Sequence, residues 1–386
     1  MMDGSSLQIS GSNMATIPVG RLNWPDVMKL LAIWMVFFSH SKQSGELGVF
    51  MRDHSVEIFF FCSGFFALHH INDRPVEYIK LYFRRLIIPY IFFSVATYLI
   101  LPTEMYISPI RFFASTLLAM RGHTLVATLW FLPALFCEAV LFYILYRFTS
   151  YFTSKPGKQI AFLIALILPL WSLSGILYPY IAKISMFGVT EWKLPWSFDS
   201  VLEYLPFYAA GAFLFPFLED VRTGETDKNR CFVVYVVLTV CAIWTFLCIL
   251  FPQLETFYQP FLPKSGGIFC AYALKCILAW PIVFTSVLIG FLLNRLNFLA
   301  TIGRQTFLFC CLEMIFTIFV FEIQKIFGFH LIWSHVAEPL SKTIYPIDGI
   351  CFSILEIVVI YFIFVPFFRD VTPWVCGAGN SSSKNK

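Results

Sequence analysis

The sequence alternates long apolar segments with short polar stretches, and ten of the apolar segments are 18 to 24 residues long. About 20 apolar residues in a helix are enough to cross the hydrocarbon core of a bilayer. Hydrophobic residues make up 59% of the 386 residues and charged residues 13%, which is more apolar surface than a soluble domain can bury. We therefore predict an all-α polytopic membrane protein with about ten transmembrane helices in one bundle. The predicted spans are residues 26–45, 55–72, 84–102, 128–148, 159–178, 200–218, 231–251, 270–293, 304–327 and 348–368.

The predicted spans lie within one membrane domain, residues 21–370. We expect residues 1–20 to form a disordered cytoplasmic N-terminus and residues 371–386 a flexible cytoplasmic tail. Two stretches, 103–127 and 179–199, hold apolar pieces that are too short to span, so we expect interfacial or re-entrant loops there. The first apolar segment is followed by no small-residue cleavage site, which favours a retained first helix over a signal peptide.

The distribution of Lys and Arg predicts the orientation in the membrane. If the N-terminus is cytoplasmic, 17 of the 27 Lys and Arg residues fall on the cytoplasmic side. Cytoplasmic loops are enriched in these residues, so we predict that both termini are inside and that residues 43–54 are outside. The net charge of +4 is small, and we expect no nucleic-acid partner. Most of the 11 Cys lie in apolar segments without the spacing of a metal site, so we predict no metal.

The first span, in the stretch "DVMKLLAIWMVFFSHSK", carries three ionisable residues: Asp26, Lys29 and His40. Asp26 and Lys29 are three residues apart and can pair on a helix. Lys29 and His40 are eleven residues apart, which places them on one helix face with a rise of roughly 16 Å between them. Ionisable groups inside a membrane helix indicate a functional site. The alternative is that Lys29 extends to one interface and His40 simply lies at the other.

These residues belong to a pattern that resembles the start of the acyltransferase-3 family of integral-membrane acyltransferases. In that pattern an Asp is followed three residues later by a basic residue, and then by ten residues and a His. The resemblance covers the whole chain in the order and spacing of its motifs. The other matching stretches are "VEIFFFCSGFFAL" with Ser63 and Gly64, "KLYFRRLIIPYIFF" with Arg84 and Arg85, "LWFLPALFCE" with Trp130 and Glu138, and "YLPFYAAGAFL" with Gly211.

Two positions depart from the family pattern. The family often has a His ten residues after a Gly in its ninth span, whereas Gly303 is followed here by Glu313. This departure puts in doubt any role for a second membrane histidine. The basic pair before the third span is usually spaced R-x-x-R, but here Arg84 and Arg85 are adjacent, with Lys80 one turn earlier.

The resemblance implies an O-acetyltransferase of the cytoplasmic (inner) membrane. Family members move an acyl group, usually acetyl from cytoplasmic acetyl-CoA, to a sugar hydroxyl at the outer face. We therefore expect acetyl-CoA as co-substrate with no bound cofactor, and a polysaccharide or lipid-linked sugar as acceptor. The lipid bilayer is the other expected partner, and the oligomeric state stays open. Alternatives are a secondary transporter or flippase, and an acyltransferase using another donor such as succinyl-CoA. The lack of an internal repeat argues against a transporter.

The resemblance also suggests roles for individual residues. His40 would act as general base or as covalent acyl carrier, with Lys29 and Asp26 completing the catalytic set. Cations suit the phosphates of acetyl-CoA, although they also serve as cytoplasmic anchors. The candidates for phosphate binding are Lys80, Arg84 and Arg85.

On the outer side, a loop after the first span is where a sugar would arrive. We expect Arg52, Asp53 and His54 in this loop, with Glu57 close enough to pair with Arg52, although solvated loop residues are the alternative. Trp130 would stack on a sugar ring or belong to the interfacial aromatic belt. Two residues have supporting roles: Ser63 in close helix packing, and Glu138 as partner of a base such as Lys29 or Arg84.

Overall fold

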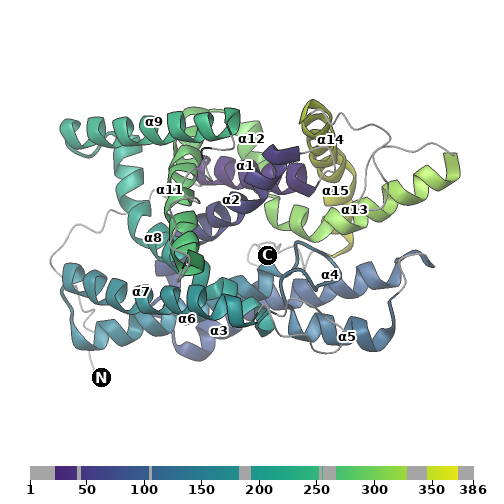
Figure 1. Cartoon of the computed structure of the whole chain (residues 1–386), viewed down its shortest axis with the longest axis horizontal. Helices are drawn as coiled ribbons and strands as arrows, with labels where there is room; N and C mark the ends of the chain where they lie inside the picture. Colours follow the sequence, from purple (N-terminus) through teal and green to yellow (C-terminus); the bar gives the residue numbers. More distant parts are fainter. Residues whose placement is uncertain are drawn as a thin grey trace, which may run out of the picture.

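The computed structural model describes residues 22–40, 45–103, 107–181, 193–251, 254, 267–327 and 346–372, and over these residues all regular elements are helices (Figure 1). The predicted all-α fold class is confirmed. The predicted terminal segments lie mostly outside the described residues.

The longer helices are α1 (Trp24–His40), α2 (Gly45–Gly64), α3 (Pro75–Tyr82), α4 (Ile88–Leu99), α5 (Pro109–Leu118), α6 (Phe131–Phe152), α7 (Pro156–Ile181), α8 (Phe198–Thr223), α9 (Lys228–Leu250), α11 (Gly267–Leu293), α12 (Asn297–Gly303), α13 (Thr306–Phe327), α14 (Pro346–Val359) and α15 (Val365–Val371). Short 3-10 or π turns are η1 (Ala67–His70), η2 (Phe83–Ile87), η4 (Pro195–Ser197) and η6 (Ile360–Phe364).

Each of the ten predicted spans overlaps a helix in the described residues. Within the described residues, seven helical stretches are long and apolar enough to cross a membrane. The other three predicted spans correspond to α1, which has 17 residues, to α2, which carries several charged residues, and to the continuous helix formed by α3, η2 and α4. The polytopic membrane architecture is therefore confirmed. The seven stretches are Phe131–Phe152, Pro156–Leu177, Pro195–Thr223, Lys228–Leu250, Tyr272–Leu293, Thr306–Ile323 and Gly349–Val371.

Helix α1 lies in the middle of the packing and contacts α2, α11, α12, α13 and α14. Its first residue, Trp24, is fully buried, and its indole Nε1 donates a hydrogen bond to Glu219 Oε2 on α8 at 2.8 Å. The Trp24 ring also contacts Phe65 and Phe291 at centroid distances of 5.1 Å each. Because it is held from several sides, α1 is a rigid support for the ionisable residues that it carries.

Helices α2 and α8 cross in direct backbone contact. A Cβ atom on Gly64 would overlap the carbonyl oxygen of Tyr208, and one on Gly211 would overlap that of Phe61. Only glycine permits such an approach between two helix backbones. The helix-packing interpretation of the Ser63–Gly64 pair accounts for this contact.

The sequence-based boundaries of the second span are wrong. Helix α2 begins at Gly45 rather than near residue 55, so Arg52, Asp53 and His54 lie on a helix and not in an outer loop. The charged residues lower the local hydropathy, but inward-facing positions continue at helical spacing through them. These positions are Leu47, Phe50, Met51 and His54.

Between α4 and α6, the chain forms the short helix α5 and then an irregular loop, residues 119–130. Ser108 caps α5 by accepting a hydrogen bond from the backbone N–H of Arg111. The predicted short, non-spanning piece in residues 103–127 agrees with this helix. The loop turns through positive φ at Ala119 and Gly122, and it leads to Trp130 at the start of α6. Most of the other predicted loop, residues 179–199, lies outside the described residues.

Candidate functional site

His40, the last residue of α1, pairs with a carboxylate on another helix. Its Nδ1 is hydrogen-bonded to Oε1 of Glu313 on α13, 273 residues further along the chain. Glu313 is buried and His40 partly buried. The sequence marked Glu313 only as a departure from a pattern, and the structure shows that this departure places a carboxylate against the histidine.

A carboxylate at Nδ1 determines how the imidazole can react. It accepts a hydrogen bond from Nδ1–H, so the lone pair of the neutral ring is on Nε2. It also stabilises the imidazolium that forms when Nε2 takes a proton. The histidine–carboxylate arrangement is that of a general base oriented by a third group. The pair can therefore activate a hydroxyl group.

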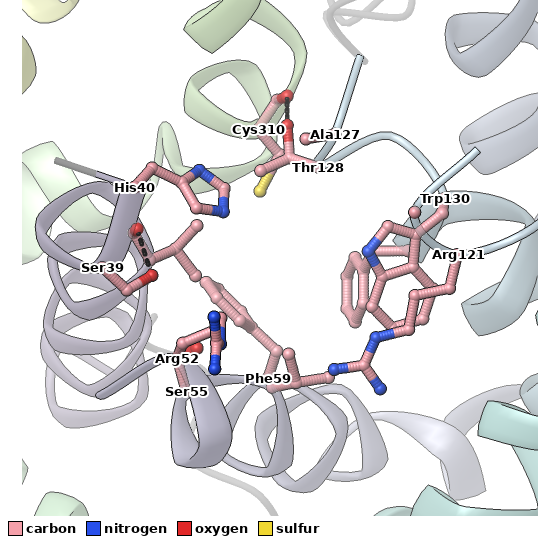
Figure 2. Close-up of a pocket in the computed structure, with 14 residues that line it drawn as sticks. Ser39, His40, Arg52, Ser55, Phe59, Arg121, Ala127, Thr128, Trp130 and Cys310 are labelled. Atoms are coloured by element: carbon pink, nitrogen blue, oxygen red, sulfur yellow. Dashed lines mark hydrogen bonds between the residues drawn. The ribbon is translucent and has the colours of Figure 1, made fainter. Parts of the chain in front are cut away.

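His40 lines a pocket of about 240 Å³ between α1, α2, α13 and the loop before α6 (Figure 2). This volume is near the lower end of small-ligand pockets, which begin at ~300 Å³. Thr128 connects the loop to α13, because its hydroxyl donates a hydrogen bond to the carbonyl oxygen of Cys310 at 2.7 Å. The side chains that shape the pocket most are His40, Arg52, Phe59, Arg121, Thr128 and Trp130.

Arg121 is a pocket residue that the sequence analysis did not select. Its guanidinium donates to the hydroxyl of Tyr204 at 2.8 Å and lies over the Trp130 ring, 4.8 Å from its centroid. Glu203 Oε2 is 4.0 Å away. The sequence feature that could have identified Arg121 is a lone arginine in an apolar loop. It is followed directly by Gly122, and Trp130 comes eight residues after that glycine.

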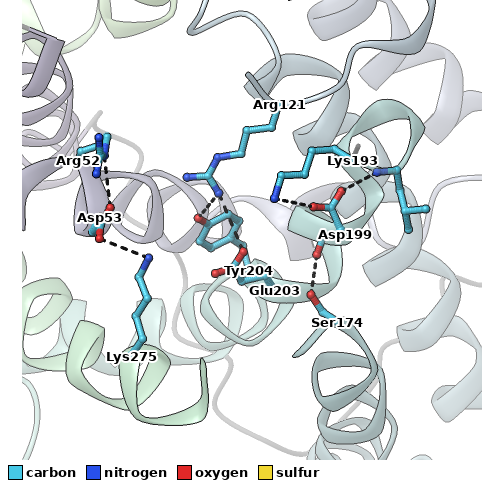
Figure 3. A network of polar contacts seen from close by, with 10 residues as sticks. Arg52, Asp53, Arg121, Ser174, Lys193, Asp199, Glu203, Tyr204 and Lys275 are labelled. Atoms are coloured by element: carbon cyan, nitrogen blue, oxygen red, sulfur yellow. Dashed lines mark hydrogen bonds and ion pairs between the residues drawn. The ribbon is translucent and has the colours of Figure 1, made fainter. Parts of the chain in front are cut away.

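The predicted acceptor-side residues separate into two groups. Arg52 and Trp130 line the pocket. Arg52 Nε pairs with Asp53 Oδ1 at 3.4 Å, and Asp53 Oδ2 lies 3.7 Å from Lys275 Nζ (Figure 3). In the described structure Arg52 forms no ion pair with Glu57, which is buried in α2. His54 is also buried and packs edge-on against Phe50 in the same helix.

The other end of α1 holds a second charged cluster. Lys29 Nζ lies 2.6 Å from Asp26 Oδ1, so the expected pair forms. Arg304 contacts the other oxygen of Asp26 at 3.4 Å and donates to Asn23 Oδ1 at 3.1 Å. Lys29 and His40 are separated by about 16 Å along the helix. The predicted catalytic set therefore divides into Asp26–Lys29 at one end of α1 and His40 at the other.

The predicted phosphate-binding cations are exposed. Lys80 lies on α3, and Arg84 and Arg85 lie on the π turn η2. None of the three forms an ion pair within the part of the chain that the structure describes, so their charge is available to an anion. π turns inside helices occur frequently at functional sites.

Glu138 does not have the partners expected for it. Its side chain is fully buried in α6, and neither carboxyl oxygen has a hydrogen bond among the described residues. Lys29 is paired with Asp26, and Arg84 is exposed. Among the described residues no group of three or more His, Cys, Asp or Glu could hold a metal ion.

A bundle of membrane-length helices, with a histidine at a pocket paired to a buried carboxylate, defines a multi-pass membrane protein with a candidate site for base chemistry. The acyltransferase domain family (Acyl_transf_3) matches residues 22–365, nearly the whole chain. The chain belongs to this acyltransferase-3 family, and the resemblance drawn from its motifs is confirmed. Comparisons with the curated proteins and with the solved structures give no match.

Proposed function

We propose that the protein is a membrane O-acetyltransferase. It moves an acetyl group from cytoplasmic acetyl-CoA to a hydroxyl of a cell-surface carbohydrate, either a polysaccharide or a lipid-linked sugar. Family membership supports acyl transfer. The single observation that carries the proposal is the pairing of His40, which lines the pocket, with the buried Glu313. Both termini are cytoplasmic, and the membrane is the cytoplasmic (inner) one.

In the proposed reaction, His40 Nε2 removes the proton of the acceptor hydroxyl while the hydroxyl oxygen attacks the thioester carbonyl. The new C–O bond forms, the C–S bond breaks, and the imidazolium returns its proton to the departing CoA thiolate. Glu313 keeps the Nδ1 proton in place and offsets the positive charge on the ring. In the alternative course, Nε2 itself attacks the thioester carbonyl and the C–S bond breaks, which releases the CoA thiolate. The acceptor hydroxyl then attacks the acetyl-imidazole, the C–N bond breaks, and the hydroxyl proton goes to the thiolate.

The donor approaches from the cytoplasmic side in this proposal. The exposed cations Lys80, Arg84 and Arg85 bind the phosphates of acetyl-CoA. The long pantetheine arm then extends into the bundle, so that the thioester reaches His40 at the far end of α1. Lys29, paired with Asp26, lies on the donor side of this path.

The experiment that tests the proposal supplies radiolabelled acetyl-CoA to inverted membrane vesicles and measures label in the carbohydrate fraction. The wild-type protein should transfer label, and His40→Gln should abolish transfer, because an amide keeps a hydrogen bond but accepts no proton at neutral pH. The matched control is His69→Gln, since His69 is an exposed histidine in the 3-10 turn η1 that follows α2. Substantial transfer by a correctly inserted His40→Gln protein would refute the role of His40.

The same vesicles test the alternatives. Succinyl-CoA in place of acetyl-CoA identifies the donor, and mass analysis of the carbohydrate identifies the added group. Deleting the gene and comparing the O-acetyl content of the cell's polysaccharides by NMR identifies the acceptor. An unlabelled carbohydrate in all of these assays would favour a transporter or flippase.

A further inference from the structure

The pocket next to His40 presents positive charge without an opposing acid at its surface. Arg52 and Arg121 both line it, and none of the described residues that line it is acidic. Figure 2 shows the two guanidinium groups on either side of Phe59, across the pocket from His40 and Thr128. The two arginines come from different elements, α2 and the loop before α6.

Carboxylates near the arginines lie behind the pocket wall. Asp53 contacts Arg52 at 3.4 Å, and Glu203 lies 4.0 Å from Arg121 (Figure 3). Both contacts are longer than the 2.7–2.9 Å of a strong charge-assisted hydrogen bond, and each is made by a single nitrogen. An arginine has five N–H donors, so donors remain on both side chains for a ligand in the pocket.

Arg121 is positioned as a fixed binding group. Its guanidinium is held by the hydrogen bond to Tyr204 and lies over the rings of Trp130 and Tyr204, at 4.8 Å and 5.8 Å from their centroids. A planar guanidinium that is already ordered loses little entropy when it binds a carboxylate or a phosphate. Trp130 also lines the pocket and adds an apolar surface suited to the face of a sugar ring.

A larger cavity lies next to the pocket. Gly122 lines both the pocket and a neighbouring cavity of about 690 Å³, whose wall also includes Arg111, His123 and Thr124. The two hollows lie along the loop before α6, and the larger one reaches α5. Arg111 adds a further cation to the wall of the larger cavity.

We propose that the acceptor is an anionic glycan whose carboxylate or phosphate group binds between Arg52 and Arg121 while a neighbouring hydroxyl reaches His40. This inference rests on the proposed acetyl transfer and adds the chemical class of the acceptor. The neighbouring sugars of the chain occupy the larger cavity beyond Gly122. The two arginines thus select the acceptor by its charge, while His40 and Glu313 carry out the transfer.

The test measures acetyl transfer from acetyl-CoA to paired acceptors by detergent-solubilised protein. One pair is an oligogalacturonide and its neutral methyl ester, and the other is a phosphorylated oligomannose and its unphosphorylated form. The wild type should use the acidic member of at least one pair with a kcat/KM about tenfold or more above the neutral member, as expected for one charge-assisted hydrogen bond. A preference in the first pair identifies a carboxylate, and a preference in the second identifies a phosphate.

Two variants assign the preference to the arginines. Arg52→Gln and Arg121→Gln should each lower the ratio of kcat/KM for the acidic acceptor to kcat/KM for the neutral acceptor by about 10- to 100-fold. Arg52 is largely exposed and pairs only with its neighbour Asp53 in the described structure, so its replacement should not disturb folding. Arg147→Gln, at an exposed arginine of α6 away from the pocket, is the matched control.

Equal use of acidic and neutral acceptors by the wild type would overturn the inference. Equal losses on both acceptors in the variants would also overturn it. The inference would also be overturned if a preparation that acetylates the cell's own carbohydrate transferred no acetyl group to any of the four acceptors. Failure with the cell's own carbohydrate as well would instead refute the proposed function.

Discussion

Replacing Glu313 with glutamine removes the charge beside His40 while keeping nearly the same side-chain shape. The pair joins α1 to α13 through Nδ1 and Oε1. A hydrogen bond to a charged group contributes roughly 1.5–3 kcal/mol. If that energy stabilises only the imidazolium of the transition state, its loss slows transfer by about 10- to 150-fold.

The tautomer of the ring adds to this effect. The glutamine amide can donate a hydrogen bond to Nδ1, which favours the neutral ring with its proton on Nε2, the nitrogen that must accept the acceptor's proton. A carboxylate-to-amide change in the serine-protease triad lowers the rate on the order of 10⁴-fold for this reason. We therefore expect Glu313→Gln to lower kcat by about 10² to 10⁴-fold.

The assay is initial-rate acetyl transfer by purified protein at saturating acetyl-CoA and acceptor, with thermal unfolding measured alongside. Glu322→Gln is the matched control, because Glu322 lies on the same helix, is half-exposed and pairs with Lys325. Its rate should stay close to that of the wild type. A folded Glu313→Gln protein with more than about half of the wild-type rate would refute the carboxylate's role, since even the weaker effect predicts a tenfold loss.

The pair also predicts a pH dependence for the wild type. A protonated imidazole cannot accept a proton, so the transfer rate should fall as the pH is lowered through the range in which histidine titrates. The measurement is kcat/KM for the acceptor over roughly pH 5 to 8. A rate that does not change over this range would contradict base catalysis by His40.

Three further predictions concern packing, donor binding and orientation. Gly211→Val should lower the yield of folded protein in fluorescence-detected size-exclusion chromatography, because overpacking costs about 1–3 kcal/mol or more, whereas Gly157→Ala, with open space around it, should not. Replacing Arg84 and Arg85 together by alanine should raise the KM for acetyl-CoA more than that for the acceptor, and an unchanged acetyl-CoA KM would leave these residues as membrane anchors. A cysteine placed at Ser44, outside the described residues, should react with an impermeant reagent in cells with a permeabilised outer membrane, and its protection would reverse the predicted orientation.

The helices could be predicted from sequence because a bilayer requires each span to be long, apolar and internally hydrogen-bonded. The Asp26–Lys29 pair was also accessible, since contacts three residues apart are set by helix geometry. The contacts of His40 and Asp53 were not, because Glu313 and Lys275 are far away in the sequence and only the packing of whole helices brings them close.

The start of α2 could not be predicted from hydropathy. Hydropathy assigned Arg52, Asp53 and His54 to a loop because charged residues there interrupt the apolar run. A charge that faces a pocket or another charge is compatible with a helix inside a protein, and hydropathy alone cannot recognise that environment. Arg121 could not be predicted as a pocket residue for a related reason, since its partners Tyr204 and Trp130 come from separate elements.

The glycine contact between α2 and α8 has a mechanical consequence. With no side chains between the two backbones at Gly64 and Gly211, these helices cannot slide or separate without losing close packing, so they should move as one rigid body. Arg52 lies on α2, and Arg121 donates a hydrogen bond to Tyr204 of α8. His40 is mounted on α1 instead. Because α1 packs directly against α2, the rigid α2–α8 unit should hold the two arginines at a fixed spacing and His40 at a fixed distance from Arg52.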